Sequence, residues 1–281
     1  MDTSEYHADT SRISATGLRY LHRSPAHYFA NFLSPNRIIR PPTPAMILGT
    51  TVHCAILEPE RFSRKYVCVA DDEICKKIGT KNPRSTAEYK AWLKEFRADN
   101  ADKEIVSLDD YNTVIDIRDA VWSHSHASKL LENVTAEKSI FFTDTDSGAM
   151  CKIRPDAIDT TSIDTPIIIE LKTCENATPS VFGRQAINFG YHNQAALYVN
   201  GLMESGMSIK QPLHIFIAVE KEPPYAVALY YTPDRVLELG RYENAIDLKT
   251  YVDCINSGVW KGYNEELTPL QIPEWTFRQF K

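Results

Sequence analysis

The segment IIIELKT, from Ile167 to Thr173, decides both the fold class and the chemistry that the sequence predicts. Its three β-branched residues predict a buried strand, which ends in an acid and a base at Glu170 and Lys172. Because side chains alternate along a strand, Glu170 and Lys172 share one face while Leu171 points to the other. An isolated pair of this kind is more often a surface salt bridge, which contributes at most about 1 kcal/mol.

A second strand-like segment favours a different interpretation. CKIRPDAID contains Asp156, and Glu170 follows 14 positions later, after the polar segment DTTSIDTP. This spacing predicts a β-hairpin that brings Asp156 next to Glu170. Two carboxylates beside each other repel unless a cation lies between them, and clustered oxygen ligands favour Mg²⁺. The pattern therefore predicts metal-dependent phosphodiester hydrolysis, in which Lys172 orients the nucleophile or stabilises the developing negative charge.

The composition is that of an ordinary soluble globular protein, with 281 residues of which 43% are hydrophobic and 24% are charged. The net charge of −6 disfavours nucleic acid as a partner, although a binding groove needs only a local basic lining. The six cysteines form no CxxC pair, which argues against a zinc site and a disulfide framework. No long apolar run and no secretion leader is visible, so we expect a cytoplasmic protein without membrane contact.

The order of the expected elements predicts an α/β or α+β domain with a mixed central sheet flanked by helices. Residues 1–12 are expected to form a flexible segment. The rest, 13–281, is expected to be a single domain with a helical and loop insertion at about 70–135. A basic loop in this insertion, Lys76 to Arg84, is a candidate for lining a substrate groove, and a solvated surface loop is an equally good interpretation.

Several local signals place the element boundaries. Ser14 and Ser24 are expected to begin two helices, and Ser107 with Asp110 forms a capping box for a third. Two more hairpins are expected, one around Asp146-Ser147-Gly148 and one around the segment KEPP. The helical stretch that follows the strand IIIELKT is expected to bend near Gly190.

Five motifs occur in an order that resembles a known enzyme family. They are LRYLHRSPAHY, GTTVHCAILEPE, RPD at Arg154 to Asp156, ELK at Glu170 to Lys172, and GYHNQAALY at Gly190 to Tyr198. Together they resemble the PD-(D/E)XK nucleases, in the branch of the RecB and lambda exonuclease domains, and most of all nuclease domains of the exonuclease VIII (RecE) type. The resemblance runs from about Ser14 to Tyr231 and implies a restriction-endonuclease-like core.

The resemblance also implies roles for individual residues. Asp156, Glu170, His53 and the backbone carbonyl of Leu171 would hold the metal, and Lys172 would complete the catalytic set. Without the resemblance, His53 would be interpreted as a buried structural histidine in an apolar helix. Supporting or DNA-binding roles are expected for Gln194, Tyr198, Tyr191, Arg154 and Arg184, although helix packing alone explains Gln194 and Tyr198 equally well.

The activity that the resemblance implies is exonuclease action on ends of linear double-stranded DNA in the 5′ to 3′ direction, leaving 3′ overhangs. Mg²⁺ is the expected cofactor, with Mn²⁺ as a substitute. The chain is expected to form a ring-shaped homo-oligomer and to act together with a single-strand annealing protein. No iron-sulfur cluster is expected, because Ser24 stands where cluster-bearing relatives have a cysteine. The alternatives are a structure-specific or defence endonuclease on the same fold, or a non-catalytic DNA-binding recombination module.

Overall fold

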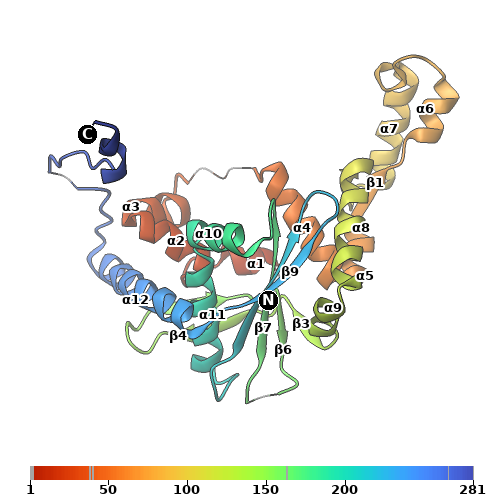
Figure 1. Ribbon diagram of the computed structural model, residues 1–281. Coiled ribbons are helices and arrows are strands. Elements are labelled where there is room, and N and C mark those ends of the chain that lie inside the picture. Colours follow the sequence, from red (N-terminus) through yellow and green to blue (C-terminus); the bar gives the residue numbers. More distant parts are fainter. Residues whose placement is uncertain (1–2, 38, 40, 163, 265, 281) are drawn as a thin grey trace.

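A five-stranded mixed sheet forms the centre of the computed structural model, which describes residues 3–37, 39, 41–162, 164–264 and 266–280 (Figure 1). Strands β7 and β8 are parallel, and the other three neighbouring pairs are antiparallel. The predicted mixed central sheet is confirmed. In spatial order the strands are β3 (Val134–Ala136), β6 (Ala157–Asp159), β7 (Ile167–Cys174), β8 (Leu213–Glu220) and β9 (Val227–Tyr231).

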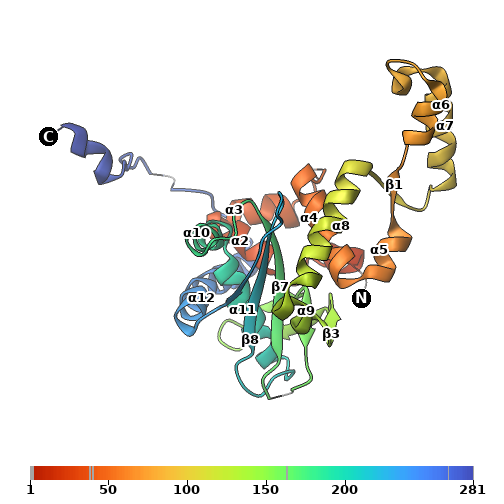
Figure 2. The ribbon, with the colours of Figure 1, turned by 45° about the vertical axis from the view of Figure 1, so that its right-hand side comes forward.

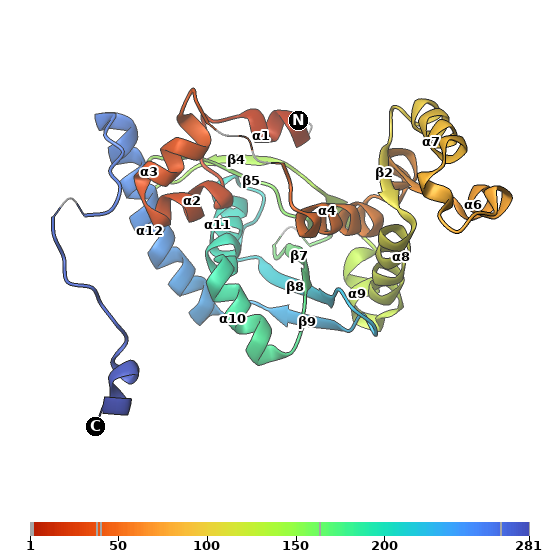
Figure 3. The ribbon, with the colours of Figure 1, turned by 90° about the horizontal axis from the view of Figure 1, so that it is seen from above.

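Helices cover both faces of this sheet, as Figure 3 shows from above. One face carries α4 (Pro44–Leu57), α8 (Leu108–Ser123) and α9 (Ser125–Leu131). The opposite face carries α2 (Ala15–Arg23), α10 (Pro179–Phe189), α11 (Tyr191–Glu204) and α12 (Asp234–Ser257). The chain therefore forms three layers with a separate hydrophobic core on each side of the sheet.

Strand β7 is buried on both faces, which explains its continuous apolar run. Ile168 belongs to the core beneath α11, whereas Ile169 and Leu171 belong to the core beneath α4 and α8. By the same alternation, Glu170 and Lys172 lie on the α11 side of the strand. The segment that decides the fold thus directs its two charged side chains toward a helix and away from solvent.

All three predicted hairpins are confirmed. They are β4 (Ile140–Thr143) with β5 (Met150–Ile153), β6 with β7, and β8 with β9. The ladder between β6 and β7 ends where Ala157 pairs with Ile169. Asp156 and Glu170 are therefore the residues next to this last pair, at the same end of the ladder.

The predicted helix starts are confirmed as well. Ser14, Ser24 and Ser107 each accept a hydrogen bond from the backbone N–H three residues later. Ser24 caps α3 (Pro25–Tyr28), which continues as a π-helical turn over Phe29–Leu33. The predicted bend lies at Gly190, whose φ of 69° ends α10 before α11 begins.

Part of the expected insertion forms an arm that projects from the body, as Figures 1 and 2 show. Its stalk begins after α5 (Pro59–Lys65) and consists of β1 (Tyr66–Val69) paired in parallel with β2 (Glu104–Ser107). Its tip carries α6 (Asp72–Ile78), the turn Pro83–Ser85 and α7 (Ala87–Asp99). The basic loop is therefore part of the arm, where Arg84 forms an ion pair of 2.7 Å with Asp71. The domain boundaries drawn from the sequence stay a prediction.

The two ends of the chain differ in their contacts with the body. Within the segment expected to be flexible, residues 3–8 form α1 (Thr3–Ala8), and the buried ring of Tyr6 lies 4.6 Å from the Lys152 ammonium. At the other end, Trp260 follows α12 and stacks on Tyr28 with ring centroids 5.5 Å apart, whereas the 3-10 helix Glu274–Phe280 lies away from the body (Figure 2). Among the described residues, no helix has both the length and the apolar character needed to cross a membrane.

Gly240 sets the closest approach of α11 and α12, and we predict that Gly240→Ala destabilises the protein. A Cβ at this position would lie 2.4 Å from the carbonyl oxygen of His192 and 2.8 Å from the Cβ of Ala196. Since both neighbours belong to a packed helix, the free energy of unfolding should fall by about 1–3 kcal/mol. Urea denaturation measures this change.

Gly183→Ala is the matched control, because Gly183 lies exposed within α10 and its added Cβ would meet nothing within 4 Å. This variant should gain about 0.5–1 kcal/mol of stability from the better helix propensity of alanine. Equal effects of the two substitutions would contradict the close packing of α11 on α12.

Candidate active site

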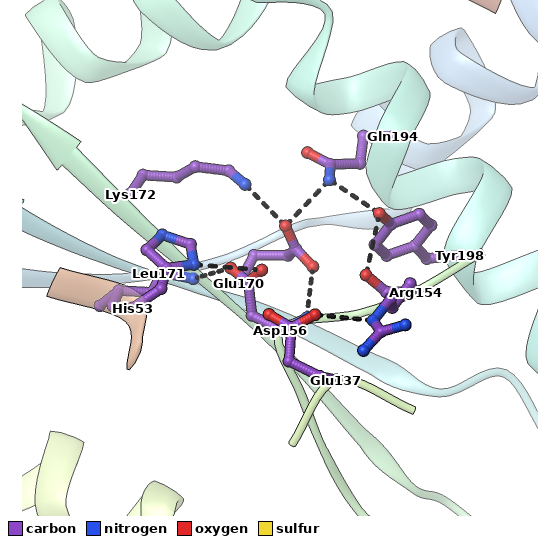
Figure 4. Close-up of polar contacts among 9 residues, drawn as sticks. All are labelled: His53, Glu137, Arg154, Asp156, Glu170, Leu171, Lys172, Gln194 and Tyr198. Atoms are coloured by element: carbon purple, nitrogen blue, oxygen red, sulfur yellow. Dashed lines mark hydrogen bonds and ion pairs between the residues drawn. The ribbon is translucent and has the colours of Figure 1, made fainter. Parts of the chain in front are cut away.

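Asp156 and Glu170 are joined just beyond the last pair of the β6–β7 ladder by two hydrogen bonds that involve the backbone (Figure 4). The N–H of Asp156 donates to Glu170 Oε1 at 3.1 Å, and the N–H of Leu171 donates to Asp156 Oδ2 at 2.8 Å. Each carboxylate thus takes up a backbone donor beyond the end of the ladder. The predicted proximity of the two acids is confirmed.

Lys172 lies beside Glu170, as the strand alternation predicts. Its Nζ donates to Glu170 Oε2 at 2.6 Å and lies 5.2 Å from the ring centre of Tyr191. Glu170 is fully buried, and Lys172 is largely so. The pair is therefore an internal one, unlike the surface salt bridge that an isolated acid and base would form.

Helix α11 supports this pair through two residues four positions apart. Gln194 Nε2 donates to Glu170 Oε2 at 2.9 Å and to the hydroxyl of Tyr198 at 3.0 Å. The hydroxyl of Tyr198 in turn donates to the carbonyl of Arg154 at 3.3 Å. Gln194 therefore contacts the acidic site directly, and Tyr198 contacts the segment between β5 and β6 that leads to Asp156.

His53 and Glu137 complete the group around Asp156. His53 extends from α4, and its Nδ1 lies 3.4 Å from Asp156 Oδ1. His53, Glu137 and Asp156 offer ligand atoms that all lie within 4.8 Å of one another. Within the described part of the chain, no other group of three His, Cys, Asp or Glu side chains is as close. The convergence of His53 on Asp156 agrees with the role that the resemblance implies.

Glu137 is the member of this group that sequence reasoning missed. It follows β3 directly and adopts φ 53°, in the left-handed region that costs a residue other than glycine about 1–3 kcal/mol. Its N–H donates to the carbonyl of Asp156 at 3.0 Å, and its Oε2 accepts from Arg154 Nε at 2.8 Å. The backbone strain and the arginine contact hold the carboxylate next to Asp156.

The pKa values of Asp156 and Glu170 are shifted in opposite directions. Burial raises the pKa of Asp156, but the positive charges of His53 and Lys172 outweigh burial and lower that pKa to about 2. Burial together with the Asp156 carboxylate raises the pKa of Glu170 to about 7. Asp156 thus carries the firmly fixed negative charge of the pair.

The surrounding groups respond to the same charges. Burial lowers the pKa values of His53 and Lys172, but the nearby carboxylates outweigh burial, so both pKa values are raised. Burial, followed by repulsion from Asp156, raises the pKa of Glu137. The cluster therefore combines closely spaced acids with a lysine whose charged form is favoured.

The remaining predicted residues occupy distinct places. Both carboxylate oxygens of Glu170 accept hydrogen bonds, and Leu171 contacts Asp156 through its N–H. The guanidinium of Arg154 contacts Glu137 and Ser139, whereas Arg184 is exposed on α10. The metal-binding roles of Glu170 and the Leu171 carbonyl, and the DNA-binding roles of the two arginines, stay predictions.

The donor set fits a divalent cation. Two carboxylates and one imidazole converge at His53, Glu137 and Asp156, and Glu170 and the Leu171 carbonyl belong to the residues adjoining Asp156. Carboxylate oxygens are the ligands preferred by Mg²⁺, and the imidazole also suits Mn²⁺ and other transition metals. The repulsion between the Asp156 and Glu137 carboxylates would be offset by such an ion.

Comparisons with known proteins bear on the family and the fold of the chain. The family model of the PDDEXK-like domain of unknown function (DUF3799) matches residues 14–270. A candidate exonuclease from Eubacterium rectale has a similar structure, with a TM-score of 0.60 and 11% identity, over 99% of this chain and 98% of that chain. A phage-related exonuclease from Haemophilus somnus 129PT aligns with a TM-score of 0.33 and 11% identity, over 64% of this chain and 89% of that chain.

No curated protein sequence matches the chain significantly. At 11% identity, the Eubacterium rectale structure is evidence for the fold alone. The family match is broader evidence, because residues 14–270 include every motif on which the predicted resemblance rests. That resemblance is confirmed: the chain belongs to the PDDEXK-like domain family DUF3799 and has the PD-(D/E)XK fold.

Proposed function

We propose that the protein is a metal-dependent exonuclease that degrades linear double-stranded DNA. The observation that carries this proposal is the convergence of Asp156, Glu170 and Lys172 at one edge of the sheet, with His53 and Glu137 beside them. Membership of a PDDEXK-like family supports the same chemistry. The 5′ to 3′ direction, the 3′ overhang, the ring-shaped oligomer and the annealing partner follow from the motif resemblance and belong to this proposal.

His53, Glu137 and Asp156 would hold the cation, with Mg²⁺ as the proposed ion, and Glu170 would join them if one of its hydrogen bonds is exchanged. When bound, a divalent cation supplies positive charge that stabilises the anionic transition state and makes water more acidic. Asp156 suits this task because its low pKa keeps it ionised at neutral pH. Arg154 keeps Glu137 in place through the contact of 2.8 Å.

Lys172 would act on the phosphate and on the attacking water. It stays protonated because the carboxylates of Glu170 and Asp156 raise its pKa. As a donor it can orient the nucleophile or stabilise the negative charge that develops on the phosphate oxygens. Glu170 and Tyr191 fix the position of its ammonium group, and Gln194 fixes Glu170 in turn. Such fixed charges act without reorganising during the reaction.

The exonuclease proposal is tested with linear and covalently closed circular duplexes of the same sequence in the presence of Mg²⁺. Only the linear duplex should be degraded, and a label on either 5′ or 3′ end reports the direction. Equal degradation of both forms would favour the endonuclease alternative, because a circle offers no end.

Metal binding by the predicted ligands gives a second test. Mn²⁺ at 100 times its dissociation constant should stabilise the wild-type protein by about 2.7 kcal/mol, measured as a rise in Tm. Asp156→Asn should abolish this stabilisation and Glu137→Gln should weaken binding at least about tenfold, because each removes a charged ligand. Glu132→Gln, an exposed acid on the same segment, is the control that keeps the wild-type response.

Lys172→Ala should reduce kcat by about 10²- to 10⁴-fold while DNA affinity changes little, because it removes a donor to the transition state. Single-turnover cleavage and a binding titration with Ca²⁺ in place of Mg²⁺ separate the two effects. Lys210→Ala removes an exposed ammonium and should leave both unchanged. A parallel loss of kcat and affinity would instead assign Lys172 to phosphate positioning.

A further inference from the structure

The catalytic cluster consists of His53, Glu137, Asp156, Glu170 and Lys172. A cavity of about 300 Å³ lies next to this cluster and is lined by other residues. Its walls come from α2, from the junction of α10 with α11, and from α12, which Figure 3 shows grouped on one side of the sheet. The first turn of α11, from Gly190 to Gln194, lines it. A single turn of helix thus borders both the cavity and the catalytic cluster.

Two residues of this turn belong to both places. Gln194 lines the cavity, and its amide donates to Glu170 at 2.9 Å. Tyr191 also lines the cavity, and its ring lies 5.2 Å from the Lys172 ammonium. Only the ring of Tyr191 therefore separates a phosphodiester group placed at Lys172 from the cavity.

The walls of the cavity combine flat apolar surface with hydrogen-bonding groups. The ring of Phe189 stacks on that of Tyr191 with centroids 5.8 Å apart, and Phe189 is half exposed. Leu18 and Leu239 add apolar surface, and Asn188 contributes an amide. Ligand sites typically have this composition, with a few polar groups set in an apolar lining.

The charged groups of the cavity indicate which part of a nucleotide fits. Asp247 Oδ2 lies 2.9 Å from His22 Nδ1, and Glu243 Oε2 lies 3.0 Å from His192 Nε2 and 2.8 Å from Asn193 Nδ2. The two carboxylates, set against the single arginine Arg19 in the lining, disfavour the anionic sugar-phosphate backbone. They accept hydrogen bonds well, and the amino and imino groups of nucleobases are donors.

We propose that this cavity receives an unstacked base of the DNA strand whose phosphate lies at Lys172. The inference rests on the proposed nuclease function and adds a base-binding subsite to it. Stacking of a base on an aromatic ring is tolerant of sequence, because every base has a π-face. The exposed ring of Phe189 provides such a surface at the cavity. The subsite would therefore hold the strand in position while leaving the enzyme without sequence preference.

The test uses end-labelled duplexes that carry a tetrahydrofuran abasic residue at one position at a time near the end. For the wild-type protein, kcat/KM should fall about tenfold when the missing base is the one that enters the cavity, which matches the usual strength of base stacking. Phe189→Ala should show a similar loss on normal DNA and little further loss on the abasic duplex. Tyr242→Ala, an exposed aromatic residue of α12 outside this cavity, should behave as the wild type.

A second substrate distinguishes the subsite from the catalytic cluster. A duplex whose terminal nucleotides are all replaced by tetrahydrofuran residues offers phosphodiesters without a base, so the wild type and Phe189→Ala should hydrolyse it equally. Equal wild-type cleavage of normal and abasic ends at every position would overturn the base subsite alone, as would an equal loss by Phe189→Ala on both substrates. A wild-type protein that binds Mn²⁺ but cleaves neither substrate would overturn the proposed function and this inference with it.

Discussion

The structure of the site depends on two hydrogen bonds that continue the pairing of β6 with β7 after the ladder has ended. Asp156 and Leu171 donate their backbone N–H groups to the carboxylates of Glu170 and Asp156, respectively. The bonds stabilise the hairpin end, because a buried N–H without a partner costs about 1–3 kcal/mol. They also fix both acids side by side before any substrate arrives. Local strand geometry and the position of the candidate catalytic groups are therefore set by the same contacts.

This arrangement places charges where the fold alone would favour apolar groups. Glu170 is fully buried between the sheet and α11, and a buried charge is costly unless it is paired and hydrogen-bonded. Lys172 and Gln194 supply the partners, yet burial and Asp156 still raise the pKa of Glu170 to about 7. A cluster of this kind destabilises the fold relative to a hydrophobic core, which is typical of sites retained for their chemistry.

Much of the fold and part of the site could be predicted, and the division has physical reasons. Asp156, Glu170 and Lys172 were predictable because they lie on one hairpin, where the period of two and the turn length fix their proximity. His53 came from the motif resemblance, since nothing local ties α4 to β7. Glu137 carries no motif, and its position depends on φ 53° and on the contact with Arg154, neither of which periodicity reveals. The projecting arm could not be predicted either, because it requires parallel pairing of β1 with β2, which lies far along the sequence.

Gly190 lies between α10 and α11 and sets the direction of α11, the helix that borders both the candidate site and the neighbouring cavity. Its φ of 69° is open to glycine at little cost, whereas a side chain there would be strained. The residue ends α10 and lets α11 start along a new axis, so that Gln194 reaches Glu170 and Tyr191 reaches Lys172. Gln194 and Tyr191 lie three positions apart on α11, so both side chains lie on the same side of that helix. The left-handed turn at Gly190 therefore sets the direction of the helix that supports the candidate site, which explains why a glycine stands at this point of the motif.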